Sequence, residues 1–181
     1  METKSARCIA TLFVMVFLMA GCSPNREKLI GEIEEFEASF TQLDCEMDTL
    51  SARKIIGLYT RFADAFPEDS LAPIYLFKAS DVLQGICDYE TSATYLDRVI
   101  NNYEGFEGLP LCYFFLGRVY EQSEEWEAAA AAYEDFLDRY PDHFLAADTR
   151  AILPLVKQGM DDEAQLEYLL AHTSDSLLTE D

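Results

Sequence analysis

Apolar residues recur along most of this chain with the three- and four-residue spacing of an α-helix. Tyr59, Phe62 and Phe66 line one face of such a helix, together with the alanine at position 63. The same pattern returns at 96–103 and at 133–140, each time after a step of 37 residues. A fixed period in the thirties is typical of stacked supersecondary units. The pattern therefore predicts an all-α chain built from repeated helices.

Each repeat contains a second helix before the one just described. Residues 72–77 recur 37 positions later as residues 109–114, with a proline near the start of both segments. Proline fits the first turn of a helix, where no intrahelical donor is lost. We expect these two helices to run to about Gly85 and Gln122.

One repeat resembles the tetratricopeptide repeat (TPR) family, and the residues that carry the resemblance are Leu116, Gly117, Tyr120, Trp126, Ala129, Tyr133 and Pro141. The family needs a small residue on each helix of a pair where the backbones cross. Gly117 and Ala129 fit that requirement, and Ser80 and Ser92 take the same places one repeat earlier. The departures are Phe136, where the family prefers alanine, and the period, which is about 34 residues in the family.

The resemblance implies a TPR-type α-solenoid of antiparallel helix pairs, with about three units in residues 50–173. Near its end, Phe144 to Val156 has the pattern of a further first helix that Pro154 interrupts, and Asp162 to His172 that of a closing second helix. Residues 174–181 form an acidic tail. Terminal repeats of such stacks are commonly atypical.

Upstream of the repeats, residues 29–49 are expected to form one amphipathic helix followed by a loop. Leu29, Ile33, Phe36, Phe40 and Leu43 form a single apolar stripe. Such a helix either caps the first end of the stack or self-associates as a coiled coil. The capping alternative is favoured because a coiled coil needs more heptads. The loop is expected at residues 44–50.

The first 21 residues have the features of a signal peptide. Lys4 and Arg7 precede 13 uncharged residues, Cys8 to Ala20, which span about 20 Å as a helix and are too short for a bilayer core of about 30 Å. Small residues just before Cys22 resemble a bacterial lipobox, although Met19 stands where leucine is commonest. The alternative is a plain signal peptide with an incidental cysteine.

Together these features resemble the small TPR lipoproteins of Gram-negative bacteria. The resemblance implies removal of residues 1–21, acylation of Cys22, and a short lipidated tether over residues 22–28. Ser23 is not aspartate, which by the sorting rule of some Gram-negative lipoproteins favours the outer membrane. We therefore expect a lipid-anchored protein of the cell envelope that faces the periplasm.

Charge narrows the choice of partner. The chain has 13 Lys and Arg against 34 Asp and Glu, so its net charge is −21. Such a chain repels phosphate backbones, which excludes nucleic acid as a partner held by bulk electrostatics. The same excess favours an envelope protein or peptide with a basic patch.

Three cysteines remain after the signal peptide and Cys22, namely Cys45, Cys87 and Cys112. None of them has the spacing of a zinc site. The end of one helix and the start of the next should hold Cys87 and Cys112 at opposite ends of the stack, too far apart for a disulfide. We expect all three to be buried small apolar side chains.

The sequence contains no catalytic, phosphate-binding or calcium-binding motif. His143 and His172 are expected to be solvated. We therefore expect no enzymatic activity, no metal and no cofactor.

The favoured function is that of a membrane-anchored scaffold that binds another envelope protein, and the resemblance points to a role in envelope or outer-membrane assembly. By resemblance to TPR proteins, the first helix of each pair should line a concave groove, whose residues here are Ile74, Phe77, Asp81, Gln84, Leu111, Phe114, Arg118, Glu121 and Gln122. Phe77 and Phe114 would anchor a peptide and Arg118 would meet a carboxylate, unless both phenylalanines pack between helices. The alternative is a periplasmic glycan-binding or enzymatic accessory lipoprotein.

Overall fold

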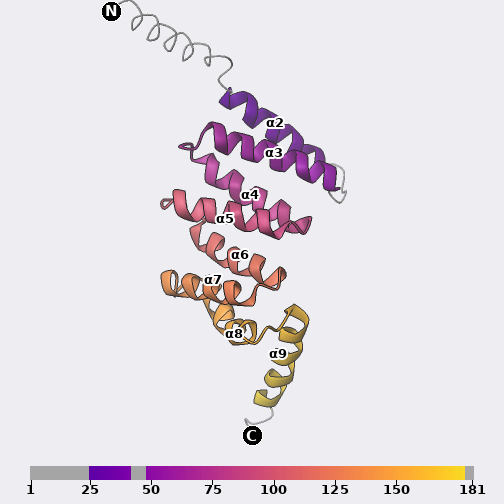
Figure 1. The fold of residues 1–181 in the computed structure, drawn as a ribbon, viewed down its shortest axis with the longest axis vertical. Helices are drawn as coiled ribbons and strands as arrows, with labels where there is room; N and C mark the ends of the chain where they lie inside the picture. The colour runs from indigo at the N-terminus through magenta and orange to yellow at the C-terminus, as the bar shows by residue number, and fades with distance from the viewer. Residues whose placement is uncertain (1–24, 42–47, 178–181) are drawn as a thin grey trace, which may run out of the picture.

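The computed structural model describes residues 25–41 and 48–177, and every regular element in these ranges is an α-helix. All but the last of the helices pack on one another in chain order as a single stack (Figure 1). Their bounds are α2 Arg26–Thr41, α3 Thr49–Ala65, α4 Leu71–Gly85, α5 Tyr89–Asn102, α6 Leu109–Gln122, α7 Trp126–Arg139, α8 Ala146–Val156 and α9 Asp162–Leu177. The all-α, TPR-type arrangement of helix pairs expected from the sequence is confirmed.

The repeat period is visible in the backbone itself. Phe66, Tyr103 and Tyr140 end α3, α5 and α7 with φ near −130° and ψ between 54° and 60°. Each donates its N–H to the carbonyl four residues before it, at 2.9–3.0 Å. Cys87 and Glu124 take positive φ values of 58° and 61° in the turns before α5 and α7. Residues 37 positions apart therefore have the same backbone conformation in successive units.

Two different contacts bring the helices of a pair together. In the first pair the buried Ser92 hydroxyl of α5 donates to the Ser80 carbonyl of α4 at 2.9 Å. In the second pair the Tyr133 ring of α7 lies over Gly117 of α6, so closely that a Cβ at Gly117 would stand 2.5 Å from a ring carbon. Ala129 is fully buried beside them. Small residues at both crossings keep the backbones close.

The first end of the stack is covered by α2, which buries Leu29 and Ile33 against α3. This helix begins at Arg26, three residues before the expected start, because the Asn25 side chain accepts the N–H of Lys28 at 3.0 Å. Likewise α3 begins at Thr49 inside the expected loop. Its cap is Asp48, whose carboxylate accepts two backbone N–H groups at 2.8 and 2.9 Å.

The last end departs from the expected closing pair. Helix α8 contains Pro154 and ends two residues after it. Proline removes one backbone hydrogen bond and disturbs the turn before it, so a helix seldom continues far beyond it. Helix α9 continues to Leu177, beyond the expected end at His172 and into the expected tail. It also runs away from the stack instead of packing along α8 as a second helix would (Figure 1).

No helix among the described residues is long and apolar enough to cross a membrane. The expected signal peptide, Cys22 and Cys45 lie outside the described residues.

Adding one methyl group at two helix glycines should have opposite effects. Gly117→Ala drives a Cβ into the Tyr133 ring, whereas Gly57 in α3 is exposed and has nothing within 4 Å of its would-be Cβ. We expect Gly117→Ala to destabilise by about 1–3 kcal/mol and Gly57→Ala to stabilise by up to about 1 kcal/mol. Thermal unfolding should show a lower melting temperature for the first variant only. Equal melting temperatures would contradict this helix crossing.

Candidate functional site

The residues expected to line the groove lie at different ends of their helices. Ile74 and Leu111 stand in the first turns of α4 and α6, and Gln84 and Gln122 stand in the last turns, with Asp81 one turn before the end of α4. Ten residues of helix span about 15 Å, so Ile74 and Gln84 are well separated. Ile74, Asp81 and Gln122 are exposed, and Leu111 and Gln84 are half-buried. The structure therefore does not gather these side chains at one point.

Both phenylalanines proposed as anchors pack between neighbouring helices. Phe77 of α4 meets Phe115 of α6 edge-on, with ring centroids 5.7 Å apart. Phe114 contacts Tyr133 and Phe136 of α7, at 5.8 and 5.9 Å between centroids. Both side chains are half-buried. The packing alternative left open by the sequence is the one observed, and these rings offer a partner little free surface.

Two charged residues of the expected groove, Arg118 and Glu121, already have partners within the protein. Arg118 forms a two-pronged ion pair with Asp162 of α9, each N–O distance being 3.2 Å. Glu121 is only 4% exposed. It accepts a hydrogen bond from the Tyr133 hydroxyl at 2.6 Å and another from the Gln165 amide of α9. Glu121 is thus closed to a partner, and Arg118 already has a carboxylate.

This network fixes the first turns of α9 to α6 and α7. Gln165, itself 5% exposed, also donates to the Met160 carbonyl at 2.7 Å and so holds the preceding turn. A polar cluster this buried is stable only when every member is satisfied, and no buried side-chain polar atom in the described residues lacks a partner. The interaction explains why α9 leaves the line of the stack.

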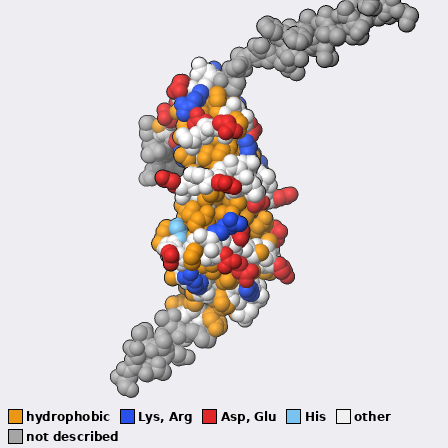
Figure 2. Space-filling model, turned by 90° about the vertical axis from the view of Figure 1, so that its left-hand side faces the viewer, with side chains coloured by type: hydrophobic (Ala, Val, Ile, Leu, Met, Phe, Trp, Pro, Cys, Tyr) orange, Lys and Arg blue, Asp and Glu red, His pale blue; other side chains and the backbone are white. Residues whose placement is uncertain are grey.

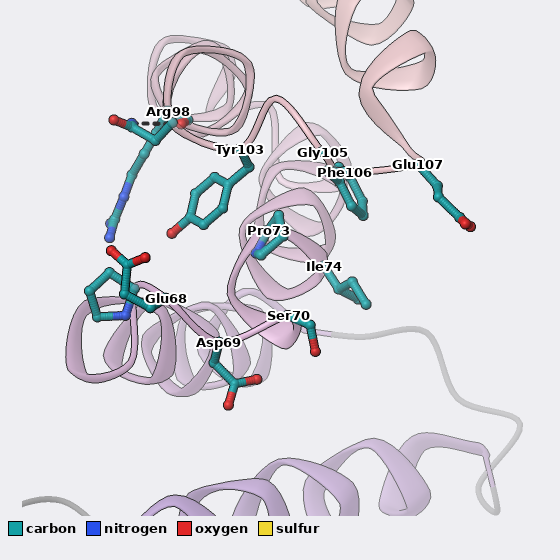
Figure 3. A pocket seen from close by; sticks show the side chains of 12 residues that line it. Glu68, Asp69, Ser70, Pro73, Ile74, Arg98, Tyr103, Gly105, Phe106 and Glu107 are labelled. Carbon is teal, nitrogen blue, oxygen red and sulfur yellow. Dashed lines mark hydrogen bonds between the residues drawn. The ribbon is translucent and has the colours of Figure 1, made fainter.

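A cleft of about 690 Å³ opens at the other end of the helices. It lies between the turn that joins α3 to α4 and the turn that joins α5 to α6 (Figure 3). Pro67, Pro73, Ile74, Tyr103 and Phe106 supply its apolar walls. Polar groups at the cleft come from Glu68, Asp69, Ser70, Arg98, Asn102 and Glu107. Of the groove residues expected from the sequence, it contains Ile74 alone.

The two turns that border the cleft are held in place by contacts of their side chains. Asp69 pairs with Arg26 of α2 at 2.5 and 3.2 Å and accepts the N–H of Leu71 at 2.9 Å. The Arg26 hydrogen bond keeps the pKa of the Asp69 carboxyl below its usual range. In the second turn the Phe106 ring folds onto Gly108, where a Cβ would stand 2.5 Å from the ring. Both turns are therefore fixed before any ligand arrives.

The charges around the cleft are only partly neutralised. Arg98 is paired with Asp64 at 2.6 Å and also donates to the Ala63 carbonyl at 3.4 Å. Burial raises the pKa of the Tyr103 hydroxyl above its usual value. The positive charge of Arg98 lowers this pKa, and the negative charge of Glu68 raises it further. Both charged groups are thus within electrostatic reach of the hydroxyl.

The edge that carries the cleft also carries the start of α2. Figure 1 shows the turns after α3, α5 and α7 along one edge, on the left, with the N-terminal end of α2 above them. Figure 2 views this edge and shows apolar side chains exposed between the charged ones. Ile74 is 36% and Phe144 is 75% exposed. Sequence reasoning missed this surface, although the repeat period already places equivalent turns side by side.

Cysteine and metal chemistry has little support in the described residues. Among them, no group of three or more His, Cys, Asp or Glu side chains is arranged to hold a metal ion. Cys112 is buried, and burial raises its pKa to about 12. Cys87 is exposed, contrary to the expectation of burial, because it occupies the positive-φ turn position that Glu124 takes in the next unit. Neither thiol is in a disulfide.

Comparison of the sequence with known protein families agrees with the packing of α6 on α7 as a helix pair. Residues 112–143 match the tetratricopeptide repeat family, and this segment spans most of α6, all of α7 and the turn that follows. The chain therefore contains a tetratricopeptide repeat. No curated protein was found to match the chain.

The buried Tyr133 hydroxyl should make stability depend on alkaline pH. Burial, and then the hydrogen bond to Glu121, raises its pKa above the value of about 10 in an unfolded chain. Its contribution is therefore complete below pH 10 and is lost as the pH rises further. Tyr133→Phe should cost about 1–3 kcal/mol at pH 7 and flatten the loss of stability above pH 10.

Urea unfolding between pH 7 and 11 measures both effects. Tyr140→Phe is the matched control, because its hydroxyl has no hydrogen-bond partner among the described residues, and it should change stability by no more than about 0.5 kcal/mol. An unchanged pH slope in Tyr133→Phe would contradict the buried network.

The two described cysteines should differ in reactivity. Thiol modification needs an accessible thiolate, which the exposed Cys87 offers and the buried Cys112 does not. Maleimide treatment followed by peptide mass mapping should therefore modify Cys87 in the folded protein and Cys112 only after unfolding. Modification of Cys112 at the same rate as Cys87 would show that α6 is not packed as described.

Proposed function

We propose that this protein is a lipid-anchored TPR scaffold that binds another protein of the cell envelope. A tetratricopeptide repeat is typical of protein-interaction scaffolds, and the match to that family is the observation that carries the proposal. Its stack of helix pairs exposes the turns between helices, where a partner can bind.

The start of α2 supports an attachment close to the membrane. Because the helix begins at Arg26, only residues 23–25 separate it from Cys22. Four residue steps reach at most about 14 Å even when extended. Arg26 is in turn fixed to Asp69 at the turn between α3 and α4. An acylated Cys22 would therefore hold the cleft edge near the lipid surface.

The proposed localisation is the periplasmic face of the outer membrane, and it rests on the lipobox-like residues before Cys22 and on Ser23. The role in envelope assembly is proposed from the resemblance to small TPR lipoproteins. The partner is expected to be basic, because the chain carries a net charge of −21.

Fatty-acid labelling tests the anchor. Cells that express the full chain and are fed a clickable fatty acid should label the wild type but not Cys22→Ala, because the acyl chain is attached to that thiol. Cys45→Ala is the matched control and should label like the wild type. Equal labelling of wild type and Cys22→Ala would overturn the anchor and the localisation with it.

Affinity purification from detergent-solubilised envelope tests the scaffold. The tagged protein should retain a protein partner in stoichiometric amount, and the retention should fall as salt rises. Retention of glycan without protein would favour the alternative of a glycan-binding lipoprotein.

A further inference from the structure

We infer that the cleft between the α3–α4 and α5–α6 turns is a binding site for an extended protein segment that presents an apolar side chain next to Lys or Arg. The inference rests on the proposed scaffold function and names a surface for it other than the groove between helices. It stands on the walls of the cleft, its unbalanced charge and its rigid frame.

The walls suit an apolar side chain. Pro73 and Ile74 of α4 lie across from Tyr103 and Phe106 of the second turn (Figure 3). Pro67 of the first turn also lines the cleft. Ile74 is among the large hydrophobic side chains that stay exposed in the described residues. A cleft of about 690 Å³ is of the size that encloses small ligands or a few side chains.

The charge of the cleft selects a basic neighbour. Its lining has three carboxylates, Glu68, Asp69 and Glu107, against one guanidinium, Arg98. Arg26 neutralises Asp69 and Asp64 neutralises Arg98. Glu68 and Glu107 are exposed, and neither has an ion-pair partner among the described residues.

These two carboxylates lie on opposite sides of the cleft (Figure 3). A segment that crosses it can therefore place a cation near either one while an apolar side chain enters between them. An acidic segment or a phosphate group would meet Glu68 and Glu107 with like charge, and the only cation of the lining is already paired. Like-charge contacts of this kind act against the wrong partner.

The frame of the cleft is preformed. The Asp69–Arg26 pair fixes the first turn to α2, and Gly108 lets Phe106 lie flat in the second. A site that needs no rearrangement loses less free energy of binding to ordering. Because Arg26 lies near Cys22 in the sequence, a segment bound here would lie beside the proposed anchor.

A displayed library of random nonapeptides, selected on the full chain in detergent micelles, tests the site. Wild type should enrich peptides with Lys or Arg next to an apolar residue. The double variant Glu68→Gln/Glu107→Gln should lose the preference for basic residues, and Ile74→Ala should lose the apolar one. Glu90→Gln is the matched control, since it removes another exposed carboxylate, at the start of α5 and outside the lining of the cleft.

Fluorescence anisotropy with one enriched peptide, and with its Lys→Gln version, gives the size of the effect. Each glutamate replaced should weaken binding of the basic peptide roughly two- to fivefold, as for exposed ion pairs, and leave the Lys→Gln peptide unchanged. The inference would be overturned if the selection enriched no peptide or enriched acidic peptides. It would also be overturned if Glu68→Gln/Glu107→Gln and Glu90→Gln bound the basic peptide equally well. A third contradicting result would be that Ile74 mediates binding to phosphatidylethanolamine vesicles in place of peptide.

The two proposals fail separately. An envelope partner retained equally by wild type and by Glu68→Gln/Glu107→Gln would leave the scaffold function standing and remove the cleft from it. If the double variant lost peptide binding but Cys22 were not acylated, the cleft would remain the binding site and the proposed lipid anchor would be refuted.

Discussion

The helices of the stack bury their apolar faces mainly against the helices next to them in the chain, and the rest of the structure depends on how closely those neighbours approach. The approach is set where Ser92 donates to Ser80 and where the Tyr133 ring lies over Gly117. A larger side chain at either place would separate two helices, and the displacement would pass to the turns at both ends. The geometry of the turns is thus a consequence of the crossings.

The two ends of the helices have different roles because their turns differ. At one end the tight turns before α5 and α7 use positive φ at Cys87 and Glu124. Helix α9 is attached to α6 by Asp162, which pairs with Arg118, and by Gln165, which donates to Glu121. These two charged groups of the expected groove are therefore already bound. At the other end the longer turns leave a cleft between Pro67 and Phe106.

The same edge connects the proposed anchor with the proposed site. Arg26 begins α2 and also neutralises Asp69 in the wall of the cleft. The excess of carboxylates at the cleft gives the acidity of the chain a definite place, because Glu68 and Glu107 stand beside apolar walls that a partner could cover. Net charge by itself steers a partner toward the protein but does not say where it binds.

The sequence by itself determined the repeat. The apolar positions at Tyr59, Phe62 and Phe66 and their equivalents 37 and 74 residues later predicted the helices, and Gly117 predicted the close crossing, because helix periodicity and small residues act locally. Helix starts were less exact, since the caps at Asn25 and Asp48 depend on single side-chain orientations.

Only the tertiary structure decided which polar groups remain available. Glu121 has the same charge in the sequence as Glu68 and Glu107, yet it is bound by Tyr133 across the helix pair and by Gln165, 44 positions away. Arg118 is likewise already paired with Asp162, also 44 positions away. Glu68 and Glu107 have no ion-pair partner among the described residues. Likewise Phe77 and Phe114 look like anchors until Phe115, Tyr133 and Phe136 cover them. Exposure depends on contacts between distant segments, and a periodic pattern along one chain does not contain them.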